Sequence, residues 1–295
     1  MPESAAPDEP LPPDTVLARP VVTYVVAPPA PAAPLELPTL SRASAAAGTG
    51  LVVLALAVTL LFSVAGGLGL DLVLRVLHRD APSPMLLHTV IIVDKWISAA
   101  LVLLFTVFLL RYYHLRPAAF GVRRDQLSTQ AAWGLATLFG VYAAFAVSLA
   151  AVVVLLLLNP RLQEDLTNRA EFLGLLPVNS VLGAIALLIP VAIHEELLFR
   201  GLLIPFLRRL GLGWTWAIVA SAAFFAVLHI GQGWLAIPQV FFIGIALGAF
   251  FVLSRSLLAV MIAHFCFDFA QLQLIRVLQP WMEEFSRHAA AAGAG

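Results

Sequence analysis

Two adjacent carboxylates and an arginine, Glu195, Glu196 and Arg200, interrupt an otherwise apolar segment at residues 180–210. Ionisable groups at the depth of a bilayer cost several kcal/mol, so such residues are by default candidates for a functional site. Two later apolar segments carry further groups of this kind. We therefore predict one site between helices, built from Glu195, Glu196, Arg200, His229, His264 and Asp268.

The spacing of the first three groups predicts separate tasks for the two glutamates. Glu196 and Arg200 are four residues apart, so on a helix they share a face, and a buried pair of this kind neutralises both charges. Glu195 points about 100° away from Glu196 and is free to face a cavity. We predict that Glu195 performs chemistry and that the Glu196–Arg200 pair supports it. The alternative is a charged cluster that only holds helices together.

The later segments contribute two histidines and an aspartate. His264 and Asp268 are four residues apart, so Asp268 either supports His264 directly or faces the same site. A lone histidine can also be a structural residue that bonds to a neighbour. Counted from the predicted helix ends, the depths of Glu195, His229 and His264 differ by about 10 Å, which agrees only roughly with one shared site.

These residue types suit the activation of water. A carboxylate with two histidines can do so by general-base catalysis or by holding a divalent metal such as zinc, for which Glu195, His229 and His264 are the candidate ligands. A His–Asp pair can stabilise an oxyanion. The zinc-protease motif HExxH is not met, because Leu198 occupies the position of its second histidine.

Composition defines the class of protein that must position these groups. Of the 295 residues, 61% are hydrophobic and 12% are charged, whereas soluble domains have about 25% charged residues. This indicates a polytopic membrane protein, with the lipid bilayer as its first partner. The formal net charge is zero, so we expect no nucleic-acid partner. The single cysteine, Cys266, excludes an intramolecular disulfide.

The fold class predicted is all-α, a transmembrane bundle of seven helices. An eighth would form if the stretch before Asp94 inserted separately; otherwise Asp94 and Lys95 lie near a membrane interface. Pro190 and Pro205 are candidate kinks in the fourth helix. The predicted apolar segments are 49–70, 93–112, 130–158, 180–210, 213–229, 234–253 and 256–276.

The same pattern divides the chain into four parts. They are a disordered Pro/Ala-rich tail at 1–46, N-terminal transmembrane helices at 47–178, a catalytic core at 179–276 and a polar, Ala-rich tail at 277–295. With seven helices, more basic residues fall on the N-terminal side of the membrane. The positive-inside rule then predicts a cytoplasmic N-terminus.

Three motifs in order, Glu195-Glu196-x-x-x-Arg200, Phe225-x-x-x-His229 and His264-x-x-x-Asp268, resemble the signature of one family. It is the CPBP family of intramembrane proteases, which includes CAAX prenyl endopeptidases and bacteriocin-processing enzymes and is also called the Abi family. The resemblance covers roughly residues 180–272. It implies an integral membrane endopeptidase that cleaves membrane-associated protein or peptide substrates.

The resemblance also implies roles for single residues. Glu195 and His229 would activate the water, and His264 with the residue at 268 would stabilise the oxyanion. Eukaryotic members carry Asn at this last position. Asp268 would therefore have to orient His264, remain protonated or bind a metal. Members are described both as metalloproteases and as glutamate-dependent enzymes, so the family leaves the metal open.

Two other functional classes compete with the protease. One is a non-catalytic immunity or scaffold protein that keeps the fold and binds a partner. The other is a proton-coupled transporter that uses Glu195, His229 and His264 as a relay. The intact motifs favour the protease, and the absence of a visible internal repeat weighs against the transporter. The Ala- and Arg-rich composition indicates a bacterial plasma membrane.

Overall fold

The computed structural model describes residues 37, 40–76, 83–123, 126–162, 164–166, 173, 175–177 and 180–293. Within these residues all regular structure is helical and no strand occurs, which confirms the predicted all-α class. Residues 1–36, the larger part of the predicted tail, lie outside the described residues.

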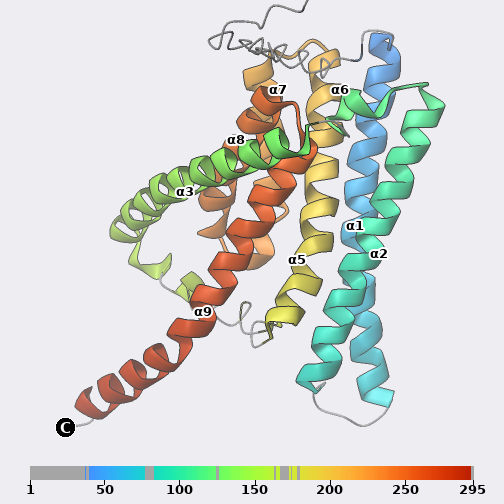
Figure 1. Ribbon diagram of the computed structural model, residues 1–295. Coiled ribbons are helices and arrows are strands. Elements are labelled where there is room, and N and C mark those ends of the chain that lie inside the picture. The colour runs from blue at the N-terminus through green and yellow to red at the C-terminus, as the bar shows by residue number, and fades with distance from the viewer. Residues whose placement is uncertain are drawn as a thin grey trace, which may run out of the picture. The chain divides into compact units, whose positions relative to one another are not determined.

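In the part of the chain that the structure describes, six helices are long and apolar enough to cross a membrane. Each of them overlaps one of the predicted segments (Figure 1). They are α1 (Arg42–Val76), α2 (Pro84–Tyr112), α3 (Leu127–Leu158), the continuous segment Val181–Arg209, α8 (Ala236–Ser254) and α9 (Leu257–Gly293). The remaining predicted segment forms the shorter α7 (Trp214–Val227).

Helix α7 has 14 residues, or about 21 Å, and falls short of the ~30 Å hydrocarbon core. His229 therefore follows the end of a helix instead of lying within one. A short turn, η4 (Ile230–Gln232), then leads the chain into α8. This difference from the predicted segment 213–229 places a loop next to the predicted site.

Helix α2 corrects the predicted start of the second segment at residue 93. The helix begins at Pro84, where the Ser83 side chain accepts a hydrogen bond from the Leu86 amide at 3.3 Å. Asp94 and Lys95 thus lie inside one continuous helix, where they form an ion pair at 2.9 Å. The two charges compensate each other, so the helix can continue through them. The stretch before Asp94 belongs to α2 and does not form a separate eighth helix.

The boundaries of both predicted tails also differ from the structure. Helix α1 begins at Arg42, before the predicted boundary at 46, and Leu37 and Leu40 are already buried. The Arg209 side chain donates a hydrogen bond to the Leu40 carbonyl. At the other end, α9 continues through the predicted polar tail as far as Gly293, where the Ala-rich sequence favours helix.

The segment that carries the two glutamates changes its winding immediately after them. Helix α5 (Val181–Glu196) is followed by a π-helix, η3 (Leu197–Leu203), and then by α6 (Ile204–Arg209). Every residue of η3 is buried. π-helical turns are rare and often mark functional sites.

Neighbouring helices enclose this segment. In Figure 1, α5 lies between α9 and α2, and it packs against both. Helix α7 packs on α8, where a Cβ added at Gly244 would come within 3.0 Å of the Ala222 side chain. Small residues at such contacts let membrane helices approach closely. The close approach of α7 to α8 brings the residues after α7 toward α5 and α9.

Candidate active site

The two glutamates at the end of α5 face different partners. The Glu195 carboxylate lies 4.0 Å from Nε2 of His229 and 3.7 Å from Nε2 of His264. Glu196 instead accepts a hydrogen bond from Arg200 at 2.8 Å. The divergence predicted from the 100° turn between adjacent residues is present in the structure.

The Glu196–Arg200 pair is fully enclosed, with side-chain exposures of 0% and 1%. Arg200 also donates to the Gly244 carbonyl at 3.4 Å, and its guanidinium lies 4.5 Å from the centre of the Phe225 ring. A cation over an aromatic face is favourable, more so when it is desolvated. The pair therefore ties the π-helix to α7 and α8.

His229 is held in one tautomer. Its Nδ1 lies 2.7 Å from the Phe225 carbonyl oxygen, which can only accept, so Nδ1 carries the proton. In the neutral ring, Nε2 is then the unprotonated nitrogen, and it is this atom that faces Glu195. The Phe225 ring packs edge-on against the imidazole, with centroids 4.5 Å apart. The motif Phe-x-x-x-His is thus one packed and hydrogen-bonded unit.

His264 lies between three carboxylates. Its Nδ1 is 2.7 Å from Glu196, and its Nε2 is 3.2 Å from Asp268 and 3.7 Å from Glu195. Ionised carboxylates only accept hydrogen bonds, so this arrangement favours a proton on both ring nitrogens. Asp268 contacts His264 directly. That geometry matches the first of the three alternatives for this residue, orientation of the imidazole.

The site is closed toward α6 and more open toward the end of α7. Exposure increases from the Glu196–Arg200 pair, which is sealed, to Glu195 and His229 at 17% each, and to Asp268 at 31%. Glu195 also lies 14 residues from either end of the segment Val181–Arg209, about 21 Å from each. Glu195 therefore lies at the middle of this segment, and Asp268 is the most exposed of these site residues.

The predicted metal site has less support from this geometry. In the part of the chain that the structure describes, no three His, Cys, Asp or Glu side chains are arranged to hold a metal ion. Nδ1 of His264 faces Glu196, and its Nε2 faces Asp268 and Glu195. The binding of a metal by these side chains stays a prediction.

All the predicted site residues come together. Two features were not predicted: the contact between Glu196 and His264, and the hydrogen bond from the Ser221 hydroxyl to the Phe199 carbonyl at 2.8 Å. Both contacts join different helices, so they cannot be predicted from the spacing of residues within one helix. The 10 Å scatter in predicted depth disappears, because both histidines reach the same carboxylate.

Helices long and apolar enough to cross a membrane, with a carboxylate–histidine cluster between them, indicate an integral membrane protein. Comparison with protein families gives a more specific result. Residues 177–270 match the family model described as type II CAAX prenyl endopeptidase Rce1-like. This range contains all three motifs and confirms the resemblance to the CPBP family. No match was found among curated proteins or among solved structures.

Proposed function

We propose that the protein is an intramembrane endopeptidase that hydrolyses peptide bonds of membrane-associated proteins or peptides. The observation that carries the proposal is the position of Glu195. Its carboxylate faces Nε2 of both His229 and His264, at 4.0 and 3.7 Å, inside an apolar bundle. The match of residues 177–270 to a CAAX endopeptidase model supports the same chemistry.

In this mechanism a water molecule binds between Glu195 and the unprotonated Nε2 of His229. Glu195 takes one proton as the water oxygen attacks the carbonyl carbon of the substrate. The C–N bond of the tetrahedral intermediate then breaks, and the proton held by Glu195 passes to the leaving amine. Water is consumed, and the products are a carboxylic acid and an amine.

His264 and Asp268 are proposed to stabilise the oxyanion. Nε2 of His264 lies 3.2 Å from Asp268, and a proton on this nitrogen would donate a hydrogen bond to the negative oxygen as it forms. The Glu196 carboxylate holds Nδ1 of the same ring and balances its positive charge. The fixed donor requires no rearrangement in the transition state, which is the advantage of a preorganised site.

Zinc at Glu195, His229 and His264 remains a prediction, and no step above depends on it. A bound metal would supply Lewis acidity and a more acidic water. Metal analysis of the purified protein tests this. One equivalent of zinc that is lost in a His229→Ala variant would confirm the predicted ligands.

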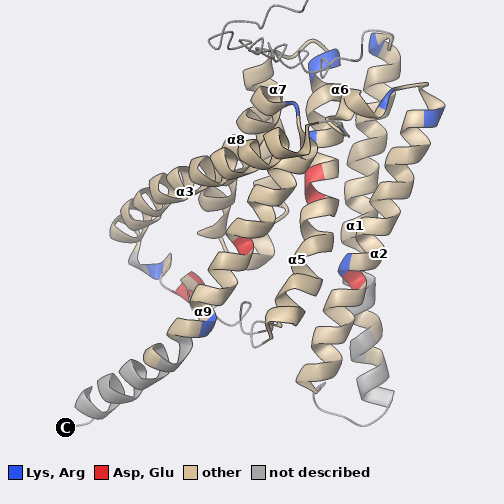
Figure 2. Cartoon of the chain, viewed as in Figure 1, with Lys and Arg blue, Asp and Glu red and all other residues tan. Residues whose placement is uncertain are grey.

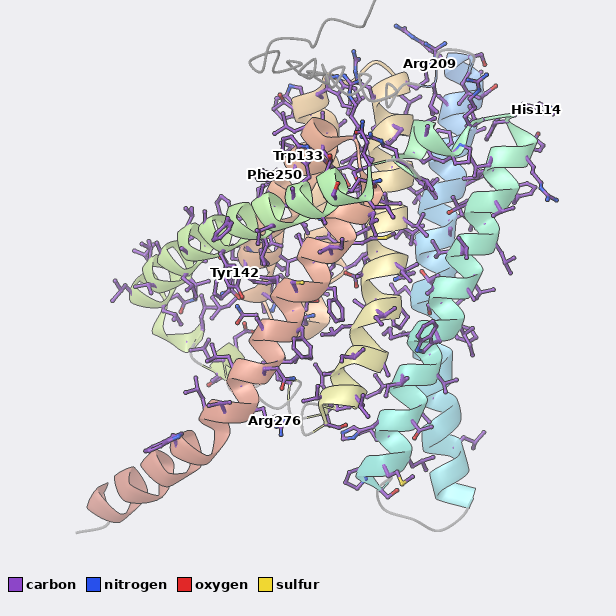
Figure 3. The ribbon with its side chains drawn as sticks, in the orientation of Figure 1. His114, Trp133, Tyr142, Arg209, Phe250 and Arg276 are labelled. Carbon is purple, nitrogen blue, oxygen red and sulfur yellow. The ribbon has the colours of Figure 1, made fainter. Side chains whose placement is uncertain are left out.

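The proposed location is a bacterial plasma membrane with the N-terminus in the cytoplasm. The orientation is supported by the distribution of charge at the two ends of the helices. The described arginines beside α1, α2, α6 and α8 gather at one end, while described acids lie deeper or toward the other end (Figure 2). Figure 3 labels Arg209 at the first end and Arg276 toward the second. Positive charge is retained on the cytoplasmic side.

The test compares protein termini in membranes from cells that carry the wild type or Glu195→Gln. This substitution keeps the side chain's size and removes the base. Glu164→Gln is the matched control, because Glu164 is exposed and lies outside the three motifs. We expect specific new termini with the wild type and the control, but not with Glu195→Gln at equal abundance.

A different outcome would support the competing classes. If the termini are identical in all strains and a cellular phenotype survives Glu195→Gln, the protein is a non-catalytic partner of the scaffold or immunity kind. If a phenotype is lost without any change in termini, pH-dependent flux in proteoliposomes tests the transporter.

A further inference from the structure

A buried carboxylate outside the site contacts the loop that follows His229. Asp165 lies in the connection between α3 and α5 and is 8% exposed. Its Oδ1 accepts a hydrogen bond from the Trp234 amide at 2.9 Å, and its Oδ2 accepts one from the Leu235 amide at 2.7 Å. Each oxygen thus binds a separate amide of a segment about 70 residues further along the chain.

These two amides come directly before α8, which begins at Ala236, with Leu235 at its cap position. The first amides of a helix have no partner within the helix and need an acceptor. The residue at the cap position, Leu235, offers no side-chain hydrogen bond. Asp165, from another part of the chain, accepts hydrogen bonds from the two amides that precede the helix, and its negative charge suits the positive end of the helix dipole.

The loop has a glycine where Asp165 touches it. A Cβ added at Gly233 would come within 2.7 Å of both carboxylate oxygens. The φ angle of Gly233 is +102°, a conformation that residues with side chains rarely adopt. Both the backbone conformation and the space at this position are therefore matched to the carboxylate.

The contact between Asp165 and the loop is linked to His229 through a short turn that two hydrogen bonds close. The Gln232 amide donates to the His229 carbonyl at 2.9 Å, and the Gly233 amide donates to the Ile230 carbonyl at 2.9 Å. These hydrogen bonds restrict the movement of Gly233 relative to His229. A displacement at the Asp165 end would therefore move His229, whose ring faces Glu195.

We propose that Asp165 is a positioning residue that fixes the His229–Leu235 loop and thereby sets His229 against Glu195. This proposal rests on the proposed function for its catalytic consequence, although the positioning itself does not require it. Asp165 lies outside the matched range 177–270 and outside the three motifs. A misplacement of about 1 Å in a reacting group can reduce a rate by about a hundredfold.

The first experiment measures the reactivity of His229 in the purified full-length protein. Diethyl pyrocarbonate modifies accessible neutral imidazoles, and mass spectrometry gives the rate at each histidine. His88 and His114, on and just beyond α2, are internal references in the same sample. The variants are Asp165→Asn, which keeps the shape and one acceptor, and Asp165→Ala, with Glu164→Gln as the control from the adjacent position.

We expect His229 to react faster in Asp165→Ala, at an intermediate rate in Asp165→Asn and at the wild-type rate in Glu164→Gln. The rates at the two reference histidines should not change. An unchanged rate at His229 in a folded Asp165 variant overturns the proposal, and so does an equal increase at all three histidines. If Asp165→Ala does not fold, Asp165→Asn alone decides between these outcomes.

The second experiment uses a cleaved peptide found by the comparison of termini. For Asp165→Asn we expect kcat to fall by about tenfold or more with little change in KM, because substrate contacts persist while His229 is displaced. A rise in KM with kcat unchanged contradicts positioning. If no cleavage is found even for the wild type, the proposed function fails, while the His229 reactivity still tests the role of Asp165.

Discussion

Glu195 and Glu196 are neighbours in sequence but have different surroundings. Glu195 is partly accessible and faces Nε2 of His229. Glu196 is sealed and bonds both Arg200 and His264. The Glu195 carboxylate is available to exchange a proton with water, while Oε1 of Glu196 is held by Arg200 and His264 as a structural counter-ion. Substitution of Glu195 should therefore mainly reduce activity, whereas substitution of Glu196 should mainly reduce stability.

Glu196→Ala is expected to unfold or strongly destabilise the protein. Removing one partner of a buried pair leaves the other charge uncompensated, which costs about 3–5 kcal/mol. Thermal unfolding in detergent should show a large fall in the melting temperature for Glu196→Ala. Glu195→Ala should change it less, since Glu195 is partly exposed and His264 would still be paired with Glu196 and Asp268. Equal stability of the two variants would contradict this division.

The sequence was informative wherever both partners lie on one helix. The four-residue spacings predicted the Glu196–Arg200 and His264–Asp268 contacts, and both are present. The contact between Glu196 and His264 joins α5 to α9, and its register depends on how the two helices slide against each other. Periodicity along one helix contains no information about that register.

At the scale of elements, the π-helix η3 separates the two glutamates from α6. Its wider winding alters the usual pairing of backbone groups, and the Ser221 hydroxyl of α7 donates to the Phe199 carbonyl within it. The sequence predicted a single long helix with kinks at prolines. The sequence did not indicate the π-helix, because the side chain that bonds to it, Ser221, lies on another helix.

Ser221→Ala is expected to destabilise the protein by about 1–3 kcal/mol, because a buried carbonyl loses its side-chain donor. Ser98→Ala is the matched control. The Ser98 hydroxyl is buried in α2 but has no hydrogen-bond partner, so its loss should be neutral or slightly stabilising. Thermal unfolding measures both variants. A larger loss for Ser98→Ala than for Ser221→Ala would refute the anchoring of η3 by Ser221.

At the scale of the whole molecule, the clustering of arginines at one end and the opening of the site toward the other have a joint consequence. If the arginine end is cytoplasmic, substrates reach Glu195 from the extracytoplasmic side. Labelling at the two ends of α7 can show on which side of the membrane each end lies. Gly213 and Gly231 flank the helix, and a side chain at either position would meet open space.

Single cysteines at these positions, in a Cys266→Ser background, test the orientation. A thiol reagent that does not cross membranes should label Gly231→Cys in intact spheroplasts. It should label Gly213→Cys only in inverted vesicles. The opposite pattern would reverse the proposed orientation, and the proposed chemistry would be unaffected.

The shortness of α7 has a consequence for the surrounding lipid. A 14-residue helix beside longer neighbours creates local hydrophobic mismatch, and a bilayer answers mismatch by thinning or by admitting water. Both responses would bring solvent to His229 at the end of α7. In proteoliposomes, cleavage should therefore slow as the acyl chains are lengthened, while Glu195→Gln stays inactive throughout. The lipid would then set the supply of the second substrate, water.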